Sequence, residues 1–144
     1  MYLFDTNVVS ELRKASAGRA DRRVLAWTQK VPSESIYLSA VCIQELEIGV
    51  LLMERRDPRQ GALLRSWLKD QVLPNFGSRI LVVDSAVAMK SAALHVPNPM
   101  SYRDGFIAAT ALVHGLTVVT RNVRDFQSTG VQLLNPWRDG SGSD

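Results

Sequence analysis

The hydrophobic positions of this chain fall into two kinds of stretch that alternate from one end to the other. Short apolar runs bounded by polar or turn-forming residues have the pattern of buried strands. They cover residues 1–4, 36–39, 80–83, 117–120 and, more weakly, 131–134. We therefore predict five short strands.

Longer stretches between these runs carry apolar residues at helical spacing. Asp21 and Asp84 stand where a helix would begin and can cap its first turn, and Gly115 stands where a helix would end. The small and polar residues 15–20 are expected to form a loop. The predicted helices cover residues 8–14, 21–30, 41–55, a segment after Pro58, 85–94 and 103–114.

Strands that alternate with helices are typical of an α/β fold in which helices cover both faces of a parallel sheet. The 144 residues fit one domain, and no internal repeat divides them. We expect a single domain over residues 1–138 and a flexible C-terminal tail over residues 139–144, where glycine and serine alternate.

Composition narrows the function classes without choosing among them. No apolar run approaches the roughly 20 residues that a membrane-spanning helix needs, and the N-terminus lacks the features of a secretory signal. A single cysteine, Cys42, excludes an internal disulfide. We expect a cytoplasmic protein without membrane contact, and a net charge of +3 allows a polyanionic partner without requiring one.

Acidic and amide side chains stand where ligands bind in this fold class, beyond the carboxyl ends of parallel strands. Asp5 follows the first strand, and Asn122 and Asp125 follow the fourth. Asp104 begins the helix that leads into the fourth strand, and there it either caps the helix or binds a cation. It reaches the same edge of the sheet only if the preceding loop brings it there.

Helical geometry separates the two glutamates near the start of the helix predicted over residues 41–55. Because successive residues turn by about 100°, Glu47 points away from the apolar face that contains Cys42 and Leu46. Glu45 lies at the border of that face, where a carboxylate needs a partner. We therefore retain Glu45 as a candidate site residue and expect Glu47 to be solvated.

Carboxylates that converge in one crevice raise each other's pKa, and a hard divalent cation removes that repulsion. Ligands that are all oxygen favour Mg²⁺, for which Mn²⁺ can substitute. His95 and His114 lack the spacing of a zinc motif and are expected to be ordinary helix-end residues, and Cys42 is expected to pack in the core.

Four ordered motifs together resemble those of PIN domains, in particular those of the VapC-type toxins of bacterial toxin–antitoxin pairs and especially the FitB-like branch. Each motif contains one of the candidate positions described above. The motifs are Leu3-Phe4-Asp5-Thr6-Asn7, residues 39–46 around Glu45, residues 103–111 around Asp104, and residues 120–126. The terminal Asn135-Pro136-Trp137 adds to the resemblance.

The resemblance implies a PIN-like three-layer sandwich with a parallel sheet of about five strands. It also implies a Mg²⁺-dependent endoribonuclease that cleaves RNA by metal-assisted hydrolysis, in which Asp5, Glu45 and Asp104 match the family's metal-binding acids. The implied partners are an RNA substrate, a second copy in a homodimer, and a cognate antitoxin that inserts into or covers the acidic groove, in a heterotetramer or a larger assembly.

The fourth acidic position of the family is where this sequence departs from the pattern. Many relatives have aspartate where this chain has Asn122, and Asp125 follows within the same motif. Either Asn122 binds the metal through its carbonyl oxygen or Asp125 takes over the catalytic role, and the sequence leaves both open.

Further candidates support the site rather than form it. Small polar side chains beside the acids would orient them, and basic residues in the same motifs would bind RNA phosphates. The orienting candidates are Thr6, Asn7 and Thr120, and the RNA-binding candidates are Arg103 and Arg121.

Other functions fit parts of the same pattern. A phosphoacceptor signalling domain needs a second acid where Thr6 stands and a late lysine, and no lysine follows Lys90. A haloacid-dehalogenase-type phosphatase needs aspartate where Asn7 stands. The alternative that the sequence leaves open is a non-catalytic RNA-binding or antitoxin-binding module on the same fold.

Overall fold

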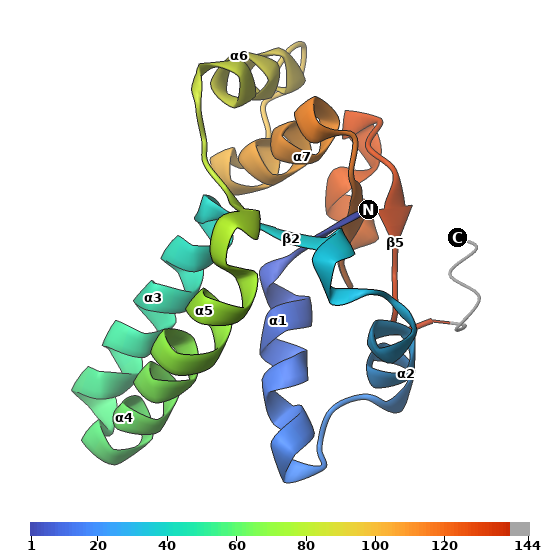
Figure 1. The fold of residues 1–144 in the computed structure, drawn as a ribbon. Coiled ribbons are helices and arrows are strands. Elements are labelled where there is room, and N and C mark those ends of the chain that lie inside the picture. The colour runs from blue at the N-terminus through green and yellow to red at the C-terminus, as the bar shows by residue number, and fades with distance from the viewer. Residues whose placement is uncertain (139–144) are drawn as a thin grey trace.

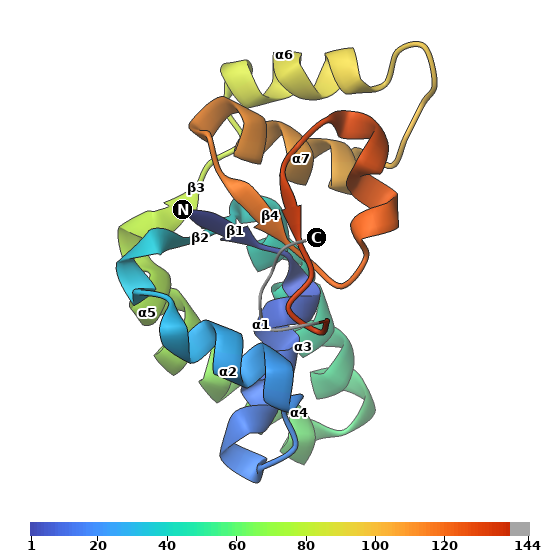
Figure 2. The same cartoon turned by 90° about the vertical axis from the view of Figure 1, so that its right-hand side faces the viewer.

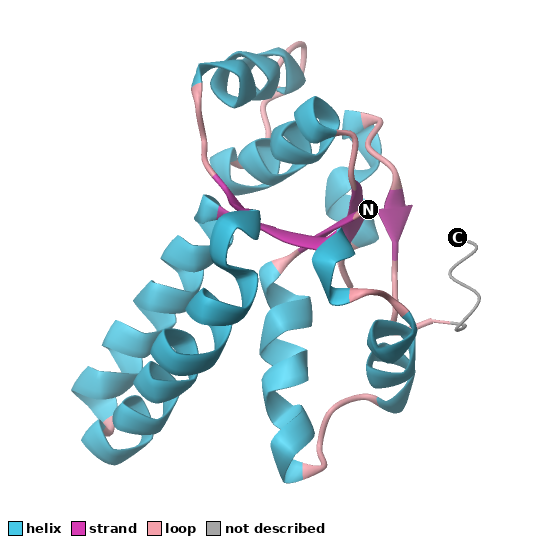
Figure 3. Cartoon of the chain, in the orientation of Figure 1, coloured by secondary structure: helices cyan, strands magenta, loops and turns pink. Residues whose placement is uncertain are grey.

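The computed structural model describes residues 1–138, and Figure 3 shows a sheet enclosed by helices over that range. The sheet has five strands in the order β3-β2-β1-β4-β5, and every neighbouring pair is parallel. This confirms the predicted α/β class with a five-stranded parallel sheet. The strands are β1 (Tyr2–Phe4), β2 (Ile36–Ser39), β3 (Ile80–Leu81), β4 (Thr117–Val119) and β5 (Leu133–Leu134).

The first strand lies at the centre of the sheet. In β1, Tyr2 pairs with Ile36 of β2 on one side and with Thr117 of β4 on the other. All five predicted runs contain a strand. The third is shorter than predicted, because the chain leaves the sheet after Leu81 and Val82 and Val83 are exposed on the way to the next helix.

Helices connect the strands as the periodicity predicted. They are α1 (Thr6–Arg13), α2 (Arg22–Lys30), α3 (Ala40–Arg56), α4 (Pro58–Trp67), α5 (Leu73–Phe76), α6 (Ser85–Leu94) and α7 (Tyr102–His114). A π-helical turn, Leu68–Val72, joins α4 to α5. The expectation of a loop over residues 15–20 was wrong in part, since Lys14–Ala17 forms a short 3₁₀ helix that ends at Gly18 in the left-handed region.

Two helical layers cover the sheet, and together with it they make the three-layer sandwich (Figures 1 and 2). Helices α6 and α7 lie on one face, and α1 to α5 lie on the other. Strand residues alternate between the layers, as the pleat requires. In β1, Leu3 packs in the core beneath α7, whereas Phe4 packs in the core formed with α1, α2 and α3.

Polar side chains fix where the helices begin and end. Asp21 accepts hydrogen bonds from the backbone N–H of Arg23 and Val24, and Asp84 accepts one from Val87, so both predicted caps are confirmed. Helix α7 ends at Gly115, whose φ of 69° lies in the left-handed region that glycine adopts without steric cost.

Helices α3 and α4 form a tight hairpin on the outside of the molecule (Figure 1). Arg65 of α4 donates to both oxygens of Glu47, at 2.6 and 2.9 Å, and to Glu54 at 3.2 Å. The Glu47 side chain is 40% exposed, as expected of a solvated residue, and a partner on the next helix also holds it, which the sequence did not indicate. Gly61 allows the two backbones to approach closely.

Within residues 1–138, no helix has both the length and the apolar character that crossing a membrane would require. The tail expected over residues 139–144 lies outside the described residues.

We predict that Gly61→Ala destabilises the protein, because the new Cβ would lie 2.4 Å from the Cα of Glu54 in α3 and would force the hairpin apart. The expected loss is about 1–3 kcal/mol in the free energy of unfolding, measured by urea denaturation. Gly49→Ala is the matched control: its Cβ would meet nothing within 4 Å, and alanine favours the helix by about 0.5–1 kcal/mol. Equal effects of the two substitutions would contradict the close-packing argument.

Candidate metal centre

Asp5 is fixed at the point where β1 passes into α1. Its backbone N–H donates to the carbonyl of Val119 at 2.9 Å and so extends the pairing of β1 with β4 by one residue. Its side chain caps α1 and accepts from the N–H of Thr6 at 2.8 Å. The side chain is fully buried, so its charge depends on the groups that surround it.

The end of β4 holds the other oxygen of Asp5. The hydroxyl of Thr120, also fully buried, donates to Asp5 Oδ2 at 2.8 Å. The side-chain amide of Asn7 donates to Asp5 Oδ2 at 3.4 Å and to the Thr120 hydroxyl at 3.3 Å. The side-chain carbonyl of Asn7 accepts from the backbone N–H of Arg121 at 3.3 Å. Thr120 and Asn7 thus join β4 to the start of α1 around this carboxylate.

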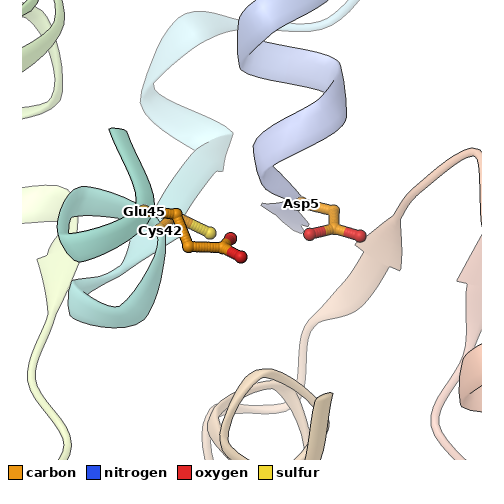
Figure 4. Close-up of side chains that lie close together, drawn as sticks. All are labelled: Asp5, Cys42 and Glu45. Carbon is orange, nitrogen blue, oxygen red and sulfur yellow. The ribbon is translucent and has the colours of Figure 1, made fainter. Parts of the chain in front are cut away.

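Glu45 approaches Asp5 from α3, on the first helical turns after β2. Figure 4 shows the two carboxylates facing each other across the gap between α3 and the start of α1. The Thr6 hydroxyl donates a short hydrogen bond to Glu45 Oε1. Burial would raise the pKa of Glu45, but hydrogen bonds from Arg103 and Thr6 outweigh it and hold that pKa below the usual value. Glu45 is therefore an anion in this structure.

Asp104 lies in the first turn of α7, and it is not the cap of that helix. Ser101 is the cap, since its hydroxyl accepts from the N–H of Asp104 at 3.1 Å. The Asp104 carboxylate is left to interact with Arg103, whose Nη1 donates to it at 2.7 Å. The loop before α7 thus brings this acid to the edge of the sheet where Asp5 lies.

Arg103 connects all three carboxylates. Its Nε donates to Glu45 at 2.6 Å, its Nη1 to Asp104, and its Nη2 to Asp5. Desolvation would lower the pKa of Arg103, but its carboxylate partners outweigh that effect and raise it further above its ordinary range. The guanidinium therefore stays charged and balances part of the negative charge of the cluster.

Cys42 lies close to the same cluster without joining its chemistry. Its Sγ, an oxygen of Asp5 and an oxygen of Glu45 lie within 4.8 Å of one another. Burial raises the pKa of the thiol to about 11, and the protonated Sγ lies 3.5 Å from the carbonyl oxygen of Phe4. A buried, protonated thiol is a poor ligand for a hard cation, as the sequence-based prediction of a core role required.

The loop after β4 places Asn122 and Asp125 differently. Asn122 lines an open groove of about 460 Å³ together with Glu45 and Arg103, and its N–H donates to the Thr120 hydroxyl at 3.0 Å. Asp125 is exposed in the 3₁₀ helix Val123–Thr129 and is not among the residues that line this groove. The choice between them stays a prediction, although Asn122 stands at the rim of the cluster.

Two grooves meet at Glu45 and Arg103. The one just described, which we call the polar groove, is also lined by Lys14, Arg121 and Trp137. A second groove of about 470 Å³, the apolar groove, runs between α3 and α7 and is lined by Ile48, Val83, Tyr102 and Phe106, among others. Glu45 and Arg103 line both.

The donor set fits a hard divalent cation. Carboxylate oxygens of Asp5 and Glu45 lie within 4.8 Å of one another, and Arg103 joins the Asp104 carboxylate to them. Oxygen ligands are what Mg²⁺ and Mn²⁺ prefer. The Arg103 guanidinium among the three carboxylates is a direct observation that the cluster accepts positive charge. Within residues 1–138, no buried side-chain nitrogen or oxygen lacks a hydrogen-bond partner, so the cluster is fully satisfied as it stands.

Comparison with known families agrees with this geometry. The sequence pattern of the family described as PIN domain matches residues 2–131. The chain belongs to the PIN domain family. The resemblance seen in the sequence motifs is confirmed, and the converging acids lie within the matched part of this PIN domain.

Named relatives extend across nearly the whole PIN domain. The chain is 38% identical over 144 residues to "Toxin FitB" of Neisseria gonorrhoeae, with 96% of this chain and 100% of the relative covered. It is 37% identical over 142 residues to "VapC ribonuclease Y4jK" of Sinorhizobium fredii, with 95% and 98% covered. The crystal structure of FitAcB from Neisseria gonorrhoeae superposes with a TM-score of 0.87 at 36% identity, covering 96% of this chain and 100% of that one.

The role of Arg103 is the main feature of the site that the sequence did not indicate. The sequence suggested an RNA contact for it, and the structure turns its side chain inward onto the acids. A signal was present: a basic residue directly precedes Asp104, and three converging carboxylates need positive charge. Helical periodicity alone does not say which way a long side chain at a helix start will turn.

We predict that Cys42 does not react with thiol reagents in the folded protein. Burial and a pKa of about 11 keep the thiol protonated, so at about pH 8 the thiolate that attacks such reagents is scarce. Labelling with a chromogenic disulfide should be absent in buffer and complete in denaturant. Fast labelling of the native protein would show that the sulfur is accessible beside Asp5 and Glu45.

Proposed function

We propose that this PIN domain is the endoribonuclease toxin of a type II toxin–antitoxin system and hydrolyses RNA phosphodiester bonds with Mg²⁺. The observation that carries the proposal is the convergence of Asp5, Glu45 and Asp104 on one cationic centre at the carboxyl edge of a parallel sheet. Relatives with whole-length matches carry the names of a ribonuclease and a toxin, which supports RNA as the substrate.

The acids of this chain would hold the metal, with Asn122 as the candidate fourth ligand. When bound, Mg²⁺ supplies a Lewis acid that polarises the scissile phosphate and lowers the pKa of an attacking water. Asp5 is held rigidly by Thr120 and Asn7, and Glu45 by Thr6, so their oxygens keep fixed directions. Such orienting contacts typically matter for metal affinity by about 10- to 100-fold.

The polar groove is suited to the RNA backbone. Arg121 and Lys14 line it beside the acids, and basic side chains at such positions bind phosphates without reading sequence. The Arg121 guanidinium lies 5.2 Å from the centre of the Trp137 ring, a cation–π contact that directs its side chain. RNA bound here would place a phosphate beside Glu45.

The proposed partners follow from the family. We assign the chain a cognate antitoxin that covers the acidic centre, a homodimeric state, and a cytoplasmic location where its RNA is found. One solved neighbour is described as FitAB bound to a DNA fragment. Another, which superposes with a TM-score of 0.67 at 26% identity, is described as a toxin–antitoxin complex from Klebsiella pneumoniae. The apolar groove beside Glu45 offers a surface that a partner segment can cover.

We predict that Asp104→Asn abolishes RNA cleavage and leaves the fold intact, because the amide keeps the shape of the side chain but loses its charge. Activity on structured RNA, including tRNA and rRNA, should fall by about a hundredfold or more, since metal-based charge stabilisation is worth several kcal/mol. Asp70→Asn, an exposed acid in the turn between α4 and α5, is the matched control and should keep full activity.

Excess EDTA should stop cleavage by the unaltered protein, and added Mg²⁺ or Mn²⁺ should restore it. If the folded protein cleaves no RNA under any metal condition yet still binds RNA or an antitoxin, the chain is the non-catalytic module instead.

We also predict that Asn122→Ala weakens Mn²⁺ binding and RNA cleavage more than Asp125→Ala does. Asn122 lines the groove with Glu45, whereas Asp125 is exposed and does not line it. Calorimetric titration of Mn²⁺ into each variant measures the difference directly. A larger loss with Asp125→Ala would assign the fourth position to that acid.

A further inference from the structure

Arg103 has a geometry that a simple RNA contact would not require. It stands at the start of α7, and its three kinds of guanidinium nitrogen each donate to a different carboxylate. The three acids come from three separate elements: the end of β1, α3 and α7 itself. One side chain therefore ties together the parts of the chain that form the centre.

Only a guanidinium makes this arrangement with a single side chain. It is planar and carries five N–H donors in a fixed fork, whereas an ammonium is a compact point charge. Three carboxylates that converge without a cation repel one another, and one of them here, Asp5, is fully buried. The guanidinium reduces that repulsion and satisfies the carboxylate oxygens it contacts.

The same oxygens are the ligands that a divalent cation would need. Arg103 contacts Oδ1 of Asp5, Oε2 of Glu45 and Oδ1 of Asp104. A guanidinium held among them would both block these oxygens and repel a second cation. We propose that Arg103 is an internal competitor for the metal centre, whose guanidinium closes the carboxylate site until a divalent cation displaces it.

A displaced Arg103 side chain has room to move. This side chain is 31% exposed, and Arg103 lines both the polar and the apolar groove. Turned into the polar groove, Arg103 adds positive charge beside Arg121, where the proposed function places RNA phosphates. Metal binding would then complete the acidic centre and release a phosphate-binding group in one step. This second half rests on the proposed function, and the competition itself does not.

The competition is tested by Mn²⁺ binding in the absence of RNA. EDTA-treated and dialysed protein is titrated with Mn²⁺ in a calorimeter for the unaltered chain, Arg103→Ala and Arg121→Ala. Arg103→Ala should bind Mn²⁺ about tenfold more tightly than the unaltered chain, the equivalent of one charge-assisted hydrogen bond. Arg121→Ala removes the same charge from the same groove without freeing a carboxylate, and should change the affinity by less than about threefold.

Thermal unfolding gives an independent readout of the same competition. In EDTA, Arg103→Ala should unfold at a lower temperature than the unaltered chain, because the three carboxylates lose their counter-charge. Saturating Mn²⁺ should raise the unfolding temperature of Arg103→Ala by more than it raises that of the unaltered chain. Arg103→Lys keeps the positive charge but loses the planar set of guanidinium donors. Its Mn²⁺ affinity should therefore lie between that of the unaltered chain and that of Arg103→Ala.

A measurement on the unaltered chain keeps the proposal testable if the variants fold poorly. The Arg103 Nε–H donates to Glu45 and should therefore give a shifted, slowly exchanging signal in ¹⁵N NMR. The signal is assigned by its loss in Arg103→Lys. If that variant does not fold, the signal is assigned through its correlation with Arg103 Cδ in the isotope-labelled unaltered chain. Diamagnetic Mg²⁺ should abolish or move this signal as the metal site fills. A signal that is unchanged at saturating Mg²⁺ would overturn the proposal.

The outcomes separate this inference from the proposed function. Tighter Mn²⁺ binding by Arg103→Ala, together with an absence of RNA cleavage by the unaltered chain, would support the competition and reject the nuclease. Equal Mn²⁺ affinity in Arg103→Ala and Arg121→Ala would reject the competition and leave the metal centre standing. Absence of Mn²⁺ binding in every form would reject both.

Discussion

Repulsion among three carboxylates is the constraint on which the rest of this centre depends. Asp5 is fully buried, and Glu45 and Asp104 converge on it from separate helices. Like charges this close are tolerated only when donors and cations surround them. The hydroxyls of Thr6 and Thr120, the backbone at the start of α1 and the guanidinium of Arg103 supply that compensation. The local structure at the carboxyl edge of the sheet is therefore organised around negative charge before any ligand arrives.

The parallel topology explains why these acids can meet at all. Strand β1 is central, so its end lies beside the ends of β2 and β4, and whatever follows each strand shares one edge. Asp5 follows β1, Thr120 follows β4, and Glu45 lies early in the helix that follows β2. Asp104 is the exception, because it precedes β4 by a whole helix. It reaches the edge through the loop that ends at the Ser101 cap, which directs α7 back across the sheet.

Residues that obey local rules were predictable from the sequence, and residues that depend on distant partners were not. The strands and helix caps follow from periodicity and residue type, and Asp5 and Glu45 follow from strand ends and helical angle. The ion pair of Glu47 was not predicted, because its partner, Arg65, lies on the next helix and no local pattern connects them. Arg103 was placed in the right region, but the direction of its side chain depends on three charges from distant parts of the sequence. The loop position of Asn122 at the groove likewise depends on tertiary packing.

Glu45 and Arg103 form the wall that the polar and apolar grooves share. Occupants of two sites with a common wall are thermodynamically linked, and the linkage is reciprocal. A protein segment in the apolar groove that favours one orientation of Arg103 would change the affinity of the polar groove for its own ligand by some factor. The ligand of the polar groove would change the affinity for that segment by the same factor. Control of this centre by a partner therefore does not require the partner to enter it, since contact with the far side of one arginine is enough.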